Sequence, residues 1–347
     1  MGSNLRLPRF QMSSTSGLKN LLPNSILLTS VNYEQRTLNI FKMNAISKTE
    51  NFRLFLLALK GAQQDNVGIL EALREKYERT ATRILKKKEI SYERLDVRYP
   101  REFDRGPFER VILDEIRSAH PQRVLLDITG LPRKVIIALL ETFDRAQTIS
   151  SQSLDLYVIY TTARFYPASL SPQLAGDLQG LLTGKPLSQL LAKGSSTRVG
   201  MVPSIYGMEA RLLLEEIQEQ TVDDFHAIIP LYQHDLLTGF NVLQSNSDLM
   251  RILSWRGYRI SFSFSILDMA NVIIDTALRW INDKTMRRSS SALIAPFNVK
   301  FLTVASYFFA KLLEEKVNTV DIIWPGVTPY NSQYSLGVRD TSIWKVT

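Results

Sequence analysis

The chain contains no cysteine, and it contains only three histidines in 347 residues. The lack of cysteine excludes disulfides, thiol nucleophiles, zinc–thiolate sites and iron–sulfur clusters, and it fits a reducing cytosol. Because the histidines are so few, a metal site with three histidine ligands is not expected. We therefore expect no metal and no cofactor.

Long apolar runs are also missing, since none reaches the roughly 18 residues that a membrane span needs. The segment Met1 to Gly17 is basic and rich in serine, without the apolar stretch of a signal peptide. We interpret residues 1–20 as a loosely ordered lead-in. The expectation is a cytoplasmic protein with no membrane partner.

The charge is unbalanced toward the positive side, with 42 Lys and Arg against 34 Asp and Glu and a net charge of +8. A surplus of this size favours polyanionic partners such as nucleic acid, or ligands that carry phosphate. The alternative is a basic surface with its charges evenly spread. The charge alone does not choose between them.

The length predicts two domains, and apolar runs alternate with helical patterns in both halves. Strands are expected at 25–30, 54–59, 92–97, 123–128 and 154–161, and again at 198–204, 225–231, 258–264, 292–295 and 320–324. Continuous apolar strands separated by amphipathic helices indicate parallel sheets covered on both faces.

These patterns predict an α/β fold of two tandem Rossmann-like three-layer domains with mostly parallel sheets. The domains are expected at residues 21–167 and 197–347, the second ending in a C-terminal tail. Residues 168–196, rich in Ser, Gly, Pro and Leu, form the expected connector. The polar and aromatic tail from Pro325 to Gly337 either folds over a cleft or covers a sheet edge.

Ligands of open parallel sheets bind beyond the carboxyl ends of the strands, which directs attention to the loops there. The loop after the first strand contains Tyr33, Glu34 and Arg36 at the start of a helix. Tyr33 and Arg36 are candidate ligand-binding residues. The alternative is a solvated first turn in which Glu34 complements the helix dipole.

The loop after the fourth strand has the sequence Asp-Ile-Thr-Gly-Leu-Pro-Arg-Lys and begins at Asp127. Gly130 permits close approach of the backbone to a ligand, and a helix that starts here directs free amides toward an anion. Thr129, Arg133 and Lys134 complete this set of candidate ligand-binding residues. Alternatively, Asp127 and Thr129 only cap the helix.

Further candidates follow other strands of both halves. Tyr160 and Arg164 could stack a base and hold a phosphate after the fifth strand. In the second half, Asn298 and Lys300 begin a helix and are candidate ligand-binding residues. For the loop of Tyr160 and Arg164, the alternative is a tyrosine-rich rim that packs against the connector.

The candidates for acid or base chemistry are Glu34, Asp127 and Asp268, which we place at strand ends. No compact catalytic motif accompanies them, so whether the protein is an enzyme stays open. The neighbouring His234 and Asp235 could form an acid–base pair, although an isolated surface histidine is the simpler interpretation.

The Tyr-Glu-Gln-Arg run after the first strand and the Asp-Ile-Thr-Gly run after the fourth resemble proteins of bacterial conflict and antiphage systems. Over residues 25–165 the pattern is similar to the CARF-type Rossmann domains, which sense cyclic oligonucleotides. The resemblance implies a phosphorylated, nucleotide-like ligand and a role in a defence complex with a protein partner or a second copy. The alternatives are an enzyme that acts on nucleotides or nucleic acid, and an adaptor that binds DNA or another subunit.

Overall fold

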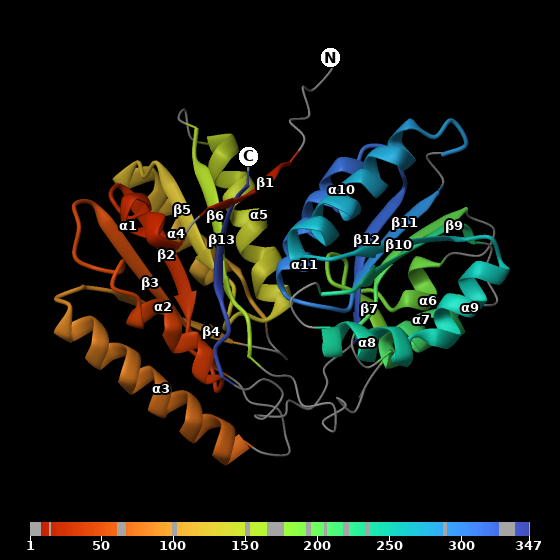
Figure 1. Ribbon diagram of the computed structural model, residues 1–347. Helices are drawn as coiled ribbons and strands as arrows, with labels where there is room; N and C mark the ends of the chain where they lie inside the picture. Colours follow the sequence, from red (N-terminus) through yellow and green to blue (C-terminus); the bar gives the residue numbers. More distant parts are fainter. Residues whose placement is uncertain are drawn as a thin grey trace. The chain divides into compact units, whose positions relative to one another are not determined.

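The chain folds into two α/β units, each built on its own mostly parallel sheet (Figure 1). The computed structural model describes residues 8–13, 15–60, 67–98, 103–149, 153–164, 177–191, 196–204, 207–217, 222–232, 236–286, 290–325 and 337–346. The N-terminal unit comprises residues 9–164 together with 337–346, and the C-terminal unit comprises residues 177–325. The predicted pair of tandem Rossmann-like domains is confirmed.

The N-terminal unit has seven strands in the order β1-β13-β6-β5-β2-β3-β4. The strands are β1 (Phe10–Ser13), β2 (Ser25–Ser30), β3 (Phe52–Lys60), β4 (Glu93–Arg98), β5 (Arg123–Asp127), β6 (Asp155–Thr161) and β13 (Thr341–Val346). Strands β2 to β6 pair in parallel. Strand β13 pairs antiparallel with β6, and β1 pairs antiparallel with β13 at the edge of the sheet.

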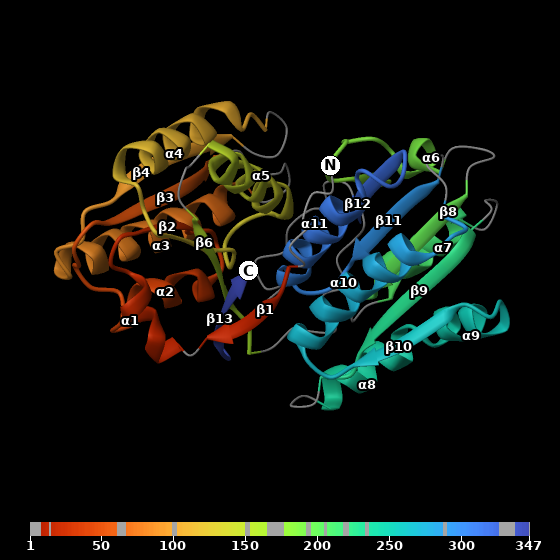
Figure 2. The ribbon, with the colours of Figure 1, turned by 90° about the horizontal axis from the view of Figure 1, so that it is seen from above.

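Helices cover both faces of this sheet, as the view from above shows (Figure 2). They are α1 (Leu18–Leu21), α2 (Asn39–Lys42), α3 (Val67–Lys87), α4 (Gly106–Ala119) and α5 (Arg133–Ile149). One layer holds α1, α2 and α3, and the other holds α4 and α5. Strand β5 is almost completely buried because both layers cover it, which explains its continuous apolar sequence.

The C-terminal unit has six strands in the order β10-β9-β8-β11-β12-β7. The strands are β7 (Leu178–Gly180), β8 (Thr197–Val202), β9 (Val222–Pro230), β10 (Arg259–Ser263), β11 (Ser291–Pro296) and β12 (Thr319–Pro325). The helices are α6 (Leu187–Leu190), α7 (Met208–Ile217), α8 (Leu236–Ser245), α9 (Ser247–Trp255), α10 (Ile266–Asn282) and α11 (Phe301–Leu313). Among the described strands of this unit, only β7 is antiparallel to its neighbour.

The two units repeat one topology. The run β6-β5-β2-β3-β4 corresponds to β12-β11-β8-β9-β10. In the N-terminal sheet β2 lies between β3 and β5, and in the C-terminal sheet β8 lies between β9 and β11. The strand order therefore reverses between β2 and β5 and between β8 and β11. This reversal is the topological switch point at which α/β sheets bind ligands.

The structure distributes the chain differently from the predicted boundaries. The expected C-terminal domain does not keep residues 341–346, because β13 pairs with β6 of the N-terminal sheet. The expected lead-in contributes β1, and the expected connector contributes β7. Each misplaced segment is short, and pairing with a strand distant in sequence decides its position. None of the helices within the described ranges has the length and apolar character needed to cross a bilayer.

Candidate functional site

The loops after β2 and β5 meet at the switch point of the N-terminal sheet and are joined there by buried hydrogen bonds. The Thr29 hydroxyl donates to Asp127 Oδ2 at 2.8 Å, and the Asn32 side-chain amide donates to the Gly130 carbonyl at 3.1 Å. Asp127 Oδ1 also accepts from the Thr129 amide at 3.0 Å. These bonds hold the two loops in one geometry.

A second set of contacts connects the loop after β2 with the end of β6. Arg36 forms a buried ion pair with Glu34, and its Nη1 donates to the Thr161 carbonyl at 2.8 Å and the Tyr160 hydroxyl at 3.1 Å. The Arg36 guanidinium also lies 5.4 Å from the centre of the Tyr160 ring. The Thr129 hydroxyl accepts from the Thr161 amide at 2.9 Å, so all three strand ends are tied together.

The predicted site residues of this unit thus fall into two groups. Five are buried and take part in the network that positions the loops: Glu34, Arg36, Asp127, Thr129 and Tyr160. At the surface, Tyr33 is half-buried, while Lys134 and Arg164 are exposed. Arg133 is also buried, with 9% of its surface exposed. The ammonium of Lys134 lies 5.8 Å from the centre of the Phe103 ring.

Gly130 occupies the narrowest place between the two loops. A Cβ atom added to Gly130 would lie 2.4 Å from the Ser30 hydroxyl oxygen and 2.8 Å from the Ser30 carbonyl oxygen. The buried Ser30 hydroxyl has no hydrogen-bond partner, and the Gly130 N–H makes no hydrogen bond, within the described part of the chain. Two polar groups are therefore left unsatisfied beside the start of α5.

We expect the substitution Gly130→Ala to destabilise the N-terminal unit by about 2 kcal/mol, because the new methyl group meets backbone that cannot rotate away. Thermal unfolding measures the effect. The control is Gly68→Ala in α3, where an added Cβ meets nothing within 4 Å and the change is neutral or favourable. Equal stability of the two variants would contradict the tight approach at Gly130.

The corresponding edge of the C-terminal sheet contains Asn298 and Lys300. The Asn298 amide donates to the Pro203 carbonyl at 2.9 Å, and its side-chain oxygen accepts from the Tyr232 hydroxyl. Asn298 thus joins the loops of β8 and β11 as Asn32 joins those of β2 and β5. Lys300 is half-buried and immediately precedes α11.

Asp268 does not end a strand, contrary to the prediction. It lies in the first turn of α10, where its amide donates to the Ser265 cap at 3.0 Å, and its side chain is exposed. Near the start of a helix this carboxylate complements the dipole. His234, Asp235 and residues 326–336 of the predicted tail lie outside the described residues.

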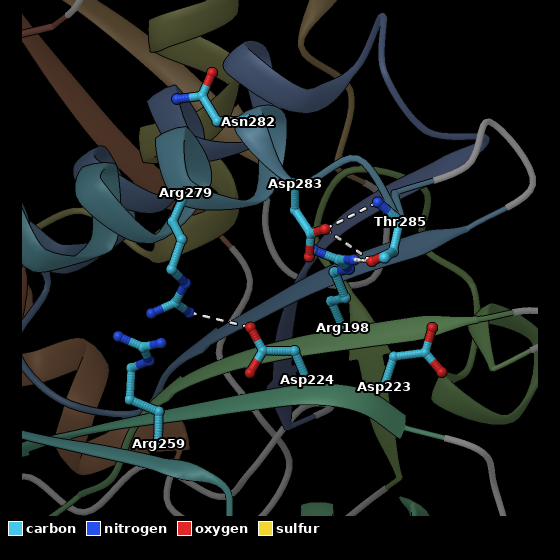
Figure 3. A pocket seen from close by; sticks show the side chains of 8 residues that line it. All are labelled: Arg198, Asp223, Asp224, Arg259, Arg279, Asn282, Asp283 and Thr285. Atoms are coloured by element: carbon cyan, nitrogen blue, oxygen red, sulfur yellow. Dashed lines mark hydrogen bonds and ion pairs between the residues drawn. The ribbon is translucent and has the colours of Figure 1, made fainter.

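A pocket lies at the opposite, amino-terminal edge of the C-terminal sheet, as Figure 3 shows. Its volume is about 680 Å³. The starts of β8, β9 and β10 and the end of α10 supply its lining, which consists of Arg198, Asp223, Asp224, Arg259, Arg279, Asn282, Asp283 and Thr285. The pocket thus brings together three arginines and three aspartates from segments distant in sequence.

Two of these arginines have carboxylate partners. Arg279 lies 3.2 Å from Asp224, which also accepts from the Trp280 indole at 2.7 Å. Arg198 lies 2.9 Å from Asp283, and its Nη2 donates to the Thr285 hydroxyl at 2.8 Å. Hydrogen bonds from the Thr285 amide and hydroxyl lower the pKa of Asp283 and keep it ionised.

His226 is buried two residues beyond Asp224 on β9. Its Nδ1 lies 2.7 Å from the Thr276 hydroxyl, and its Nε2 lies 2.7 Å from the Ser261 hydroxyl. Burial, reinforced by Arg279 and Arg259 and opposed by Asp224, lowers the pKa of His226 to about 4. The imidazole is therefore neutral at neutral pH.

Sequence reasoning missed this pocket because the rule for α/β sheets points to the carboxyl edge. A signal was present in the sequence: charged residues stand within the first three positions of three consecutive strands, at Arg198, at Asp223 and Asp224, and at Arg259. Because parallel strands begin at one edge, such charges gather there. Only the return of α10 adds Arg279.

No family model matches the chain, and no curated protein matches it. Among solved structures it is similar to the cytoplasmic domain of a prokaryotic cation chloride cotransporter, with 11% identity, 87% of this chain and 95% of that chain covered, and a TM-score of 0.22. A nitrogenase structure, Cp1 at pH 6.5, matches with 10% identity, coverages of 93% and 79%, and a TM-score of 0.18. At these TM-scores neither likeness indicates a function.

Proposed function

We propose that the N-terminal unit binds a phosphorylated, nucleotide-like ligand at the switch point between β2 and β5. The observation that carries the proposal is the pair of unsatisfied polar groups at Ser30 and Gly130, beside the N-terminus of the 17-residue helix α5. Helix N-termini with free amides favour anions. Lys134 adds an exposed positive charge in the first turn of the helix.

The geometry favours binding over turnover. Asp127 accepts hydrogen bonds through both oxygens, and Glu34 is paired with Arg36 in the interior. A general base needs a carboxylate within reach of the substrate proton, and these two instead hold loops together. We accordingly propose a sensing module of a bacterial antiphage defence system. A cytoplasmic location and a protein partner, or a second copy of the chain, belong to the same proposal.

Calorimetric titration with ATP and with a cyclic oligoadenylate tests the proposed site. We expect Lys134→Gln to weaken binding of the nucleotide about tenfold, because one phosphate loses a charged partner. The matched control is Lys76→Gln on the exposed face of α3, which removes the same charge from the same unit. Equal affinities of both variants and the unaltered protein would overturn this site.

A further inference from the structure

In the part of the chain that the structure describes, the pocket at the amino edge of the C-terminal sheet contains one arginine whose side chain has no partner. Arg259, the first residue of β10, pairs with β9 through its backbone, but its guanidinium makes no hydrogen bond or ion pair with another described residue. Arg279 and Arg198 each have an aspartate. The lining is formally balanced, with three arginines and three aspartates, so Arg259 is distinguished by the lack of a carboxylate partner within the described residues and not by a net positive charge of the pocket.

The side chains of Arg259 and Arg279 lie close to each other in the pocket. In Figure 3 the guanidinium groups of Arg259 and Arg279 face each other, and the only carboxylate drawn in contact with either belongs to Asp224. Asp224 also accepts from Trp280, so its negative charge is shared between two donors. Arg279 is half-buried and Arg259 is exposed, and two like charges brought this close repel each other, so a bound anion would relieve the repulsion.

A purely structural explanation accounts for only part of this arrangement. Arg279 lies in the last turn of α10, where the helix dipole favours a cation, and its pairing with Asp224 gives it a structural role. Neither reason applies to Arg259, which belongs to a strand. Arg198 is almost fully buried, and its Nε has no hydrogen-bond partner in the described part of the chain.

We propose that this pocket binds a small phosphorylated polyol, with its phosphate held between the guanidinium groups of Arg259 and Arg279. Guanidinium groups donate paired hydrogen bonds that match the oxygens of phosphate. The volume of about 680 Å³ exceeds that of a phosphate ion and lies in the usual range of small-molecule sites. The carboxylate of Asp223 is exposed; its Oδ2 accepts from the Ser196 hydroxyl, and its other oxygen supplies an acceptor for a hydroxyl group of the ligand.

This site is separate from the one proposed between β2 and β5. The pocket belongs to the C-terminal unit, whereas the site between β2 and β5 belongs to the N-terminal unit. The pocket lies where the strands of its sheet begin, whereas the other site lies where the strands of its sheet end. Two ligands of related chemistry would then bind one chain. A test must therefore assign any observed binding to one of the two sites.

Calorimetry on the full chain with inorganic pyrophosphate and with ribose 5-phosphate tests the proposal. We expect Arg259→Gln to weaken the binding of both compounds about tenfold or more. Arg256→Gln is the matched control, because Arg256 is exposed, does not line the pocket, and carries the same charge three residues earlier. Asp223→Asn is expected to weaken ribose 5-phosphate more than pyrophosphate.

The possible results separate this site from the other. Absence of binding by the unaltered protein at millimolar concentrations of both compounds would overturn the proposal. Equal losses in Arg259→Gln and Arg256→Gln would do the same, since they indicate a diffuse surface charge. Loss of binding in Lys134→Gln alone would assign the anion to the N-terminal unit, so that the present proposal fails while the proposed function stands. Unchanged thermal unfolding of each variant confirms that the fold is intact.

Discussion

Replacing Arg36 with methionine is expected to destabilise the N-terminal unit by about 3–5 kcal/mol, the usual cost of breaking a buried ion pair. Arg36 and Glu34 are both almost fully buried, so the substitution removes an ion pair of the Glu34 carboxylate in the interior. The hydrogen bonds from Arg36 to Tyr160 and Thr161 are lost as well. The loop after β2 then loses its attachment to β6.

Hydrogen exchange of peptides from β5 and β6 during urea titration measures this loss within the N-terminal unit alone. A local readout is needed because a chain of two units need not unfold in one step. The control is the double variant Glu34→Gln with Arg36→Met. It also removes the buried negative charge of Glu34 and is therefore expected to recover part of the stability. A single variant as stable as the original chain would show that the pair does not hold the loops.

Acidification from pH 6.5 to 4 is expected to remove about 3 kcal/mol of stability from the C-terminal unit through His226 alone. The pKa of His226 is lowered in the folded protein to about 4, whereas a histidine in an unfolded chain has its ordinary pKa of 6.5. Between these values the unfolded state binds more protons, so stability falls as the pH falls. Above pH 6.5 the contribution is fully present.

The hydrogen bonds of His226 explain why its charged form is disfavoured. The Thr276 hydroxyl donates to the Val272 carbonyl at 2.7 Å, so it accepts from Nδ1–H, and Nε2 accepts from the Ser261 hydroxyl. A protonated imidazole would donate from both nitrogens, and the Ser261 hydroxyl would have to turn. Arg259 and Arg279 add repulsion that Asp224 only partly offsets.

Urea unfolding at a series of pH values, monitored by hydrogen exchange in β8 and β9, checks this expectation. The control is His226→Gln, which keeps an amide donor and acceptor but does not titrate between pH 4 and 6.5. Subtracting its pH profile from that of the original chain isolates the histidine from the carboxylates. Parallel profiles over this range would refute a buried, neutral His226.

The two parallel sheets could be predicted from the sequence because their signals are local. Each central strand is a short apolar run, such as residues 123–127, and each is followed by a helix with apolar residues at three- and four-residue steps. These periodicities depend on neighbours a few residues away. The same reasoning located the loops at Glu34 and Asp127, since parallel strands place their carboxyl ends at one edge.

The tertiary structure alone decided what those loops do. From the sequence, Arg36 and Tyr160 were candidate ligand-binding residues, but a contact across 124 positions makes them part of one buried network. Likewise, β13 joins β6 through pairs such as Trp344 with Val158, far apart in the chain. No periodicity within a segment specifies such partners.

The pocket that contains Arg259 and Arg279 also depends on contacts between segments far apart in the sequence. Arg259 starts a strand and Arg279 ends a helix, and neither position is unusual in its own segment. They meet because α10 returns antiparallel to β10 and brings its last turn to the amino edge of the sheet. Local pattern thus predicted the central strands, the helices between them and the parallel character of the two sheets. Long-range packing decided which charged side chains are buried, because the energy of a charge depends on the groups that surround it in space. It thereby also decided which of these residues have a structural role and which are available to a ligand.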